Sequence, residues 1–478
     1  MIALASKTTQ RILRLLAFLA LSGLMPGNTI GATSPESTLT LKQAVQIALR
    51  QNPDLRLAAN RSLSSEITLK KQRGVFLPDL NITTSGNRQA GKSVDPVTGD
   101  YTASAYTRFN LNASSSLTLF NGFANTANLH QARENRDAAT ADLDRTRQGI
   151  VYTVAQEFLQ SLTARSFVAV EKENKQAQAN LLQQITAFFK AGRRPVADLY
   201  QQQSEIAASD YRLQEAERAH QVAVITLLQS LGMDPNLEVR LTEPPVEKMV
   251  ARLQEILDKG IETEGSVLDR ADITAQENRV AAARYSVRAA RSGYFPRVSA
   301  SAGLGSSYSS AIPDSDLSDQ LLDRNLSANV SLNLSIPLFD RGQTRQEVAA
   351  ARVQLENQEL DLERQRRQAK AEIRQARLNW ENAARQLTSA GKQLKYARAA
   401  LDSVEDRYRA NAATLSEVSQ SRAQYRQARY NQVAARFSLL LRGMEILYSR
   451  GDQQTLTTLV TDSTVQTAAT PASKGDKQ

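Results

Sequence analysis

The chain contains no cysteine among its 478 residues. Disulfide bonds, thiolate metal sites and a lipid attached to an N-terminal cysteine are therefore excluded. Histidine and methionine are also scarce, at 2 and 5 residues, which argues against metal handling. Because we also find no nucleophile–base pair, no phosphate-binding loop and no metal-ligand spacing, we expect neither an enzyme nor a cofactor or metal site.

Acidic residues are outnumbered by basic ones, at 49 Asp and Glu against 59 Lys and Arg, for a net charge of +10. Such a balance first suggests a nucleic-acid partner. The basic residues, however, are spread along helix faces and mixed with acidic ones. We therefore expect no nucleic-acid binding.

Long hydrophobic runs are confined to the N-terminus. Residues 1–32 combine a basic start, an apolar stretch over 15–24 and a small residue, Ala32, before a polar segment. This pattern is typical of a secretory signal peptide, and the apolar stretch is shorter than the roughly 20 residues that span a membrane. We therefore expect an exported chain in which any membrane crossing is made by strands.

Proline is missing from two long stretches, over about 122–190 and from Gly342 past Gly391. In the second stretch, bulky residues recur every seven positions, and an alanine series interleaves with them at spacings of four and three. This alternation predicts a long helix packed as a coiled coil. Shorter helical segments follow both stretches, after turns at 192–195 and 411–414. The bulky series is Ile373, Trp380, Leu387, Leu394, Leu401 and Tyr408.

Between the helices the hydrophobic period changes to two, which predicts strand pairs at about 79–119 and 297–338. Large apolar residues alternate with Ser, Asn and Thr. No further strands are available to cover the apolar face, so we expect it to meet lipid and the polar face to meet water. Four strands cannot close a barrel, and open edges are costly in hydrocarbon. Several copies must therefore assemble, and this argument alone leaves three or four copies open.

The order of elements occurs twice, at an offset of about 218–220 residues. The first repeat is predicted at 33–245 and the second at 246–451, followed by a disordered tail at 452–478. Together the patterns predict a mainly α, internally duplicated chain with a membrane β part. A long α-helical coiled-coil barrel would continue a transmembrane β-barrel with four strands from each chain.

Four segments in this order carry a family resemblance: Leu-Thr-Leu-Lys-Gln-Ala-Val (39–45), Leu-Pro-Asp-Leu (77–80), Tyr-Phe-Pro-Arg-Val (294–298) and Ile-Pro-Leu-Phe (336–339). Over about residues 38–450 the chain resembles the TolC-type outer-membrane efflux proteins. The resemblance implies a homotrimer in the outer-membrane lipid of a Gram-negative bacterium, with a 12-stranded barrel and a long periplasmic extension. It also implies a passive exit duct for a tripartite efflux or type I secretion system, whose partners are a periplasmic adaptor protein and an inner-membrane pump.

The resemblance further implies roles for the two helical turns. The sequence departs from the family pattern where Asn411 replaces a glycine, Ala413 a gate arginine and Gln420 an acidic residue. Acidic residues near a helix N-terminus also complement the helix dipole, and the tyrosine also continues the heptad series. The residues implied at the gate are Asp198, Tyr408, Thr414 and Glu417, and those at the adaptor-contact tips are Gly192, Arg193, Arg194 and Asn411.

Two alternatives belong to other functional classes. An exported structural coiled-coil protein would leave the four alternating strands unexplained. A stand-alone porin would need no pump, so its loss would slow nutrient uptake instead of sensitising cells to drugs.

Overall fold

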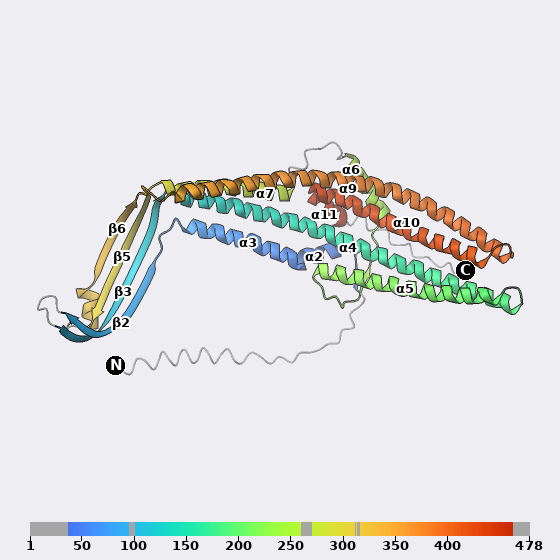
Figure 1. Cartoon of the computed structure of the whole chain (residues 1–478), viewed down its shortest axis with the longest axis horizontal. Coiled ribbons are helices and arrows are strands. Elements are labelled where there is room, and N and C mark those ends of the chain that lie inside the picture. Colours follow the sequence, from blue (N-terminus) through green and yellow to red (C-terminus); the bar gives the residue numbers. More distant parts are fainter. Residues whose placement is uncertain (1–36, 95–100, 260–269, 311, 313–315, 462–478) are drawn as a thin grey trace, which may run out of the picture. The chain divides into compact units, whose positions relative to one another are not determined.

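The computed structural model describes residues 37–94, 101–259, 270–310, 312 and 316–461 (Figure 1). The predicted signal peptide at 1–32 lies outside these residues. Two short strands, β1 (Ser37–Leu39) and β4 (Val239–Leu241), pair in a small sheet, and residues 37–38 and 238–240 belong to a separate small unit. The large unit holds all the other described residues.

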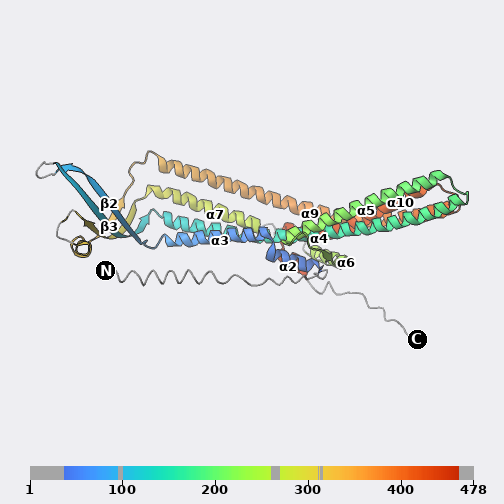
Figure 2. The ribbon, with the colours of Figure 1, turned by 90° about the horizontal axis from the view of Figure 1, so that it is seen from below.

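Two helical hairpins dominate the large unit (Figure 2). The first hairpin consists of α4 (Ala124–Lys190) and α5 (Val196–Leu231), and the second of α9 (Gln343–Arg409) and α10 (Leu415–Arg450). The long helices have 67 residues each, which is about 100 Å at ~1.5 Å per residue. Both long helices are thus confirmed, and their proline-free, Ala-, Gln- and Arg-rich sequences favour them throughout.

The alanine series of α9 is its most buried face. The alanines at 369, 376, 383 and 390 are buried, whereas the bulky series is half-buried as far as Leu394. Only at the end of the helix are Leu401 and Tyr408 buried. Small side chains let a neighbouring helix approach closely, so the alanine layer marks the seam of the coiled coil.

Shorter helices pack against the hairpins. They are α2 (Leu41–Gln51), α3 (Pro53–Gly74), α6 (Val246–Lys259) and α7 (Ala271–Arg291), of which α3 and α7 pack on α4. The predicted tail is wrong in part, because α11 (Gln453–Thr461) buries Leu456, Leu459 and Val460 on one face. The remainder, 462–478, lies outside the described residues. None of the described helices has the length and hydrophobicity to span a membrane.

The large unit also contains a four-stranded antiparallel sheet in the order β2-β3-β5-β6. Its strands are β2 (Asn81–Val94), β3 (Tyr101–Asn121), β5 (Arg297–Ser309) and β6 (Ser327–Ser335). One lateral row contains Ile82, Ala113, Leu304 and Ala328, and the next contains Asn81, Ser114, Gly303 and Asn329. The predicted apolar and polar faces are therefore confirmed. Short helical turns also occur at Ser292–Tyr294, Leu317–Asp319 and Gln320–Arg324.

The internal duplication is visible in the backbone. Every described residue with positive φ has a counterpart 219 positions away that also has positive φ. These residues end helices or lead into them, where a left-handed conformation is needed to redirect the chain. The duplication is confirmed, and its offset is 219 in the helical hairpins. The pairs are Gly122 and Arg341, Phe123 and Gly342, Gly192 and Asn411, and Gly232 and Gly451.

Candidate functional site

The turns of the two hairpins have the same backbone geometry. In the first turn (191–195) the N–H of Gly192 donates to the carbonyl of Phe189, and the N–H of Arg193 donates to that of Phe188, both at 2.9 Å. These two bonds form a Schellman cap on α4. The second turn (410–414) repeats both bonds 219 residues later around Asn411, whose φ is +60°. Glycine and asparagine are the residues that adopt this conformation at least cost.

The helices that leave the two turns begin differently. Thr414 caps α10, and its hydroxyl accepts a hydrogen bond from the N–H of Glu417 (3.3 Å). The guanidinium of Arg407 lies 3.5 Å from the Glu417 carboxylate, which connects the two ends of the turn. In contrast, α5 begins after Pro195 without a side-chain cap and carries Asp198 in its first turn. Both acidic residues lie where the helix dipole favours negative charge.

Arg194 joins the first turn to the second hairpin. Its guanidinium donates to the main-chain carbonyl of Tyr408 (3.0 Å) and lies over the ring of the same residue, 4.1 Å from the centroid. Its other terminal nitrogen is 3.8 Å from the Asp198 carboxylate. The Arg194 side chain is only 13% exposed, so these contacts are sheltered from water. The family resemblance implies that this arginine lies at an adaptor-contact tip, and in the structure its side chain points toward Tyr408 and Asp198.

Tyr408 is 2% exposed and fills a hydrophobic cluster that spans both hairpins. Leu181 and Ile185 of α4 and Leu415 and Val418 of α10 surround it. Its hydroxyl is buried and has no hydrogen-bond partner in the described part of the chain. Burial, which outweighs the opposing Arg194 cation, raises the pKa of Tyr408. The ring therefore stays neutral, and packing holds it in place.

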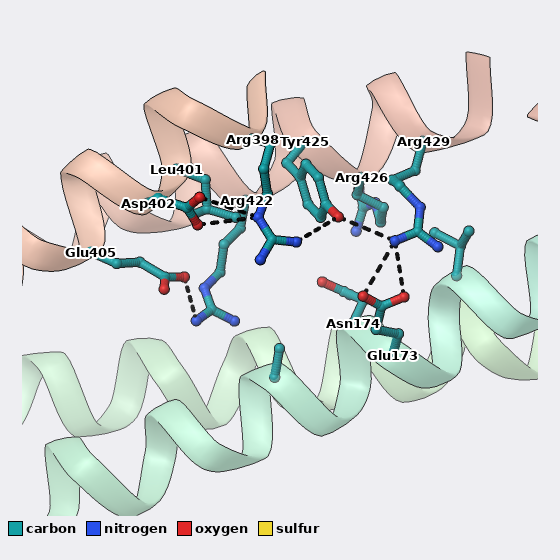
Figure 3. Close-up of a pocket in the computed structure, with 12 residues that line it drawn as sticks. Glu173, Asn174, Arg398, Leu401, Asp402, Glu405, Arg422, Tyr425, Arg426 and Arg429 are labelled. Carbon is teal, nitrogen blue, oxygen red and sulfur yellow. Dashed lines mark hydrogen bonds and ion pairs between the residues drawn. The ribbon is translucent and has the colours of Figure 1, made fainter. Parts of the chain in front are cut away.

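A second contact between the hairpins lies further along α4. A hollow of about 210 Å³ is lined by α4, α9 and α10 (Figure 3). Figure 3 shows Arg429 of α10 reaching Glu173 of α4, at 3.0 Å. The hydroxyl of Tyr425 accepts from Arg429 (3.1 Å) and from Arg398 (3.2 Å). Charged side chains therefore carry this part of the interface between the hairpins.

Glu171 is a buried carboxylate that lines a neighbouring hollow together with Arg426 and Tyr430. The sequence analysis did not single it out. It is 1% exposed, accepts a hydrogen bond from the hydroxyl of Tyr430 (2.7 Å) and lies 3.7 Å from Arg426. Burial and this carboxylate both raise the pKa of Tyr430. The available signal was a glutamate seven residues before the buried Gln178, at the position that Ala390 occupies in the second repeat.

A third polar cluster anchors α7 to the second hairpin. The buried Arg270 forms two hydrogen bonds to Asp272 (2.7 and 3.0 Å), one to Glu372 (2.9 Å) and one to the carbonyl of Ser449 (3.0 Å). In the first repeat, Asn52 donates to the corresponding carbonyl of α5 (2.7 Å). Burial alone would raise the pKa of Asp272, but the paired arginine lowers it overall. This cluster stabilises the helices that position the turns.

The structure thus divides the predicted site residues into three groups. Arg194 contacts both Asp198 and Tyr408, and Thr414 bonds to Glu417. Gly192, Arg193 and Asn411 lie at the exposed ends of the turns. Within the residues that the structure describes, no group of acidic or histidine side chains is arranged to hold a metal ion.

Comparison with known proteins gives a consistent result. The sequence model of the family described as outer membrane efflux protein matches residues 44–233 and 266–443. The pyoverdine export outer membrane protein OpmQ of Pseudomonas aeruginosa is 27% identical over 383 residues, which is 79% of this chain and 78% of OpmQ. The solvent efflux pump outer membrane protein SrpC of Pseudomonas putida is 25% identical over 317 residues, which is 66% of this chain and 64% of SrpC.

Solved structures share the fold. The CmeC outer membrane channel of Campylobacter jejuni has a TM-score of 0.74 at 18% identity, covering 86% of this chain and 85% of CmeC. The open state of the MtrE outer membrane channel of Neisseria gonorrhoeae has a TM-score of 0.69 at 17% identity, covering 86% of this chain and 88% of MtrE. Both similarities therefore extend over most of the two repeats.

Proposed function

The chain belongs to the outer membrane efflux protein family, and from this premise we propose that it is the exit duct of a tripartite export system. The predicted family, the mainly α fold with a β part, the efflux function and the outer-membrane location in a Gram-negative cell are confirmed. The finer proposal is that it works as a homotrimer, together with a periplasmic adaptor protein and an inner-membrane pump. Substrates would cross it passively, driven by the partner.

The observation that supports assembly into a homotrimer is the four-stranded sheet with two unpaired edges. β2 and β6 are its two edges, and large apolar residues such as Val330 and Leu332 are exposed on one face. A membrane sheet with open edges leaves backbone groups unpaired in hydrocarbon, at a cost of several kcal/mol each. Three copies would pair β6 of one chain with β2 of the next and would complete twelve strands around a channel.

The two turns would form the closed periplasmic end of the duct. Arg194 lies 219 residues before Ala413, the place where the family resemblance implies a gate arginine. We therefore assign the gate cation to the first turn, where it holds Tyr408 of the second hairpin. Opening would separate the hairpins at this contact, with Asp198 and Glu417 lining the passage. Gly192, Arg193 and Asn411 would meet the adaptor.

Deletion of the gene tests the function as a whole. A duct predicts that the deletion strain becomes sensitive to exported compounds and that the wild-type gene restores resistance. Slower nutrient uptake without sensitisation would instead support the porin alternative. Purification supplies a second measurement, because a detergent-dependent, heat-modifiable trimer is expected. A monomer that is soluble without detergent and keeps its sheet would refute the proposal.

A further inference from the structure

Helices α5 and α9 carry solvent-exposed apolar side chains. Within the chain, the two hairpins meet mainly along α4 and α10. On α5, Val196 is 43% exposed and Tyr211 is 67% exposed. Their counterparts 219 residues later lie in the interface: Leu415 is 2% exposed in the Tyr408 cluster, and Tyr430 packs on Phe167 of α4 with ring centroids 4.3 Å apart. The face of α10 that packs against α4 is thus buried, whereas the equivalent face of α5 is exposed to solvent.

Charged residues at this surface are reversed between the repeats. The contact of α4 with α10 includes the ion pair between Glu173 and Arg429. The counterparts of these residues are Lys392 on α9 and Asp210 on α5. Asp210 is bonded to Lys175 and Gln214 of its own hairpin but remains partly exposed, and Lys392 is exposed without a partner in the described part of the chain.

The duplication relates these two sets of residues by geometry. The rotation that superposes the first hairpin on the second superposes α4 on α9 and α5 on α10. Repeated around a ring, it carries the contact of α4 with α10 onto a contact of α9 with α5 of the next copy. We propose that this is the subunit interface and that Lys392 of one chain pairs with Asp210 of the following chain. The inference rests on the homotrimer of the proposed function.

The reversed polarity gives this interface its specificity. If α4 met α5 of another copy, Glu173 would face Asp210. If α9 met α10 of another copy, Lys392 would face Arg429. Both incorrect pairings bring like charges together, whereas the alternating order of first and second repeats pairs opposite charges at every contact. The charges thus favour a closed alternating ring over rings or chains built from like repeats.

Cross-linking tests the contact directly, because the chain has no cysteine of its own. The full-length double variant Lys392→Cys with Asp210→Cys is treated in outer-membrane fractions with a short bismaleimide. We expect covalent dimers and trimers on denaturing gels, and monomers for each single variant. Monomers for the double variant, in a preparation whose untreated protein is still trimeric, would overturn the pairing and leave the proposed function intact.

Charge reversal supplies a second, independent measurement. Lys392→Glu and Asp210→Lys are each expected to lower the temperature at which the trimer dissociates. The double reversal is expected to recover the share of this loss that comes from the Lys392 contact, while the pair of residue 210 with Lys175 stays lost. Lys395→Glu is the matched control, because the counterpart of Lys395, Gln176, bonds within its own helix. If the double variant lowers the dissociation temperature by the sum of the two single decreases, the proposed pair is refuted. A wild-type protein that is not trimeric would refute the proposed function instead.

Discussion

Replacing Arg194 by alanine is expected to shift the channel toward its open state. The guanidinium donates to the carbonyl of Tyr408 at 3.0 Å and lies 4.1 Å from the ring centroid. A hydrogen bond from a charged donor contributes about 1.5–3 kcal/mol, and a sheltered cation–π contact about 1–2 kcal/mol. Ordering an arginine side chain costs about 2 kcal/mol, which leaves about 2 kcal/mol per chain. The ratio of open to closed hairpin pairs should therefore rise roughly 30-fold.

Single-channel conductance of the purified protein in planar lipid bilayers measures this change. Arg194→Lys keeps the charge but loses the planar group that stacks on the ring, so an intermediate open probability is expected. Arg193→Ala is the matched control, because the neighbouring side chain is exposed and forms no hydrogen bond or ion pair with the described residues of the second hairpin. The reasoning fails if Arg194→Ala conducts like the wild type, or if Arg193→Ala opens the channel to the same extent.

Three further predictions concern the same scaffold. Tyr408→Phe should show the same open probability as the wild type, because the buried hydroxyl has no hydrogen-bond partner in the described chain. Tyr408→Ala should raise the open probability, because it removes about 3–5 kcal/mol of packing. A raised open probability of the Phe variant would contradict this reasoning. Gly192→Ala should lower the free energy of unfolding by about 1–2 kcal/mol, because φ of Gly192 is +71°. Asn411→Gly should not destabilise the protein. Equal melting temperatures for Gly192→Ala and the wild type would contradict backbone strain at this position. The pKa of Asp272 is lowered, so its carboxylate stabilises the fold fully above its ordinary pKa of 3.8 and progressively less as the pH falls through the lowered value. The stability gap between wild type and Asp272→Asn at pH 7 should therefore narrow below about pH 3.8 in thermal unfolding, and a constant gap would exclude this linkage.

The long helices, the strand pairs and the duplication follow from local sequence. Heptad spacing and alternation are properties of neighbouring residues, and they decide which face of a helix or strand is apolar. The turn at Gly192 was likewise predictable, because a helix that reverses needs a residue that tolerates positive φ. The prediction of a disordered tail was wrong for α11. Leu456 and Val460 lie among threonines there, and composition alone predicts disorder for such a segment.

The contacts between hairpins were decided only by the tertiary structure. Arg194 and Tyr408 are 214 positions apart, and Glu171 and Tyr430 are 259 apart. A helical pattern says that a side chain lies on a face, but it does not say which residue of a distant helix lies opposite. That depends on how the hairpins are aligned along their length, which packing around Tyr408 sets. The sequence alone therefore determined the elements and their repetition, whereas the inward turn of Arg194 and the buried Glu171 arose only when the two hairpins came together.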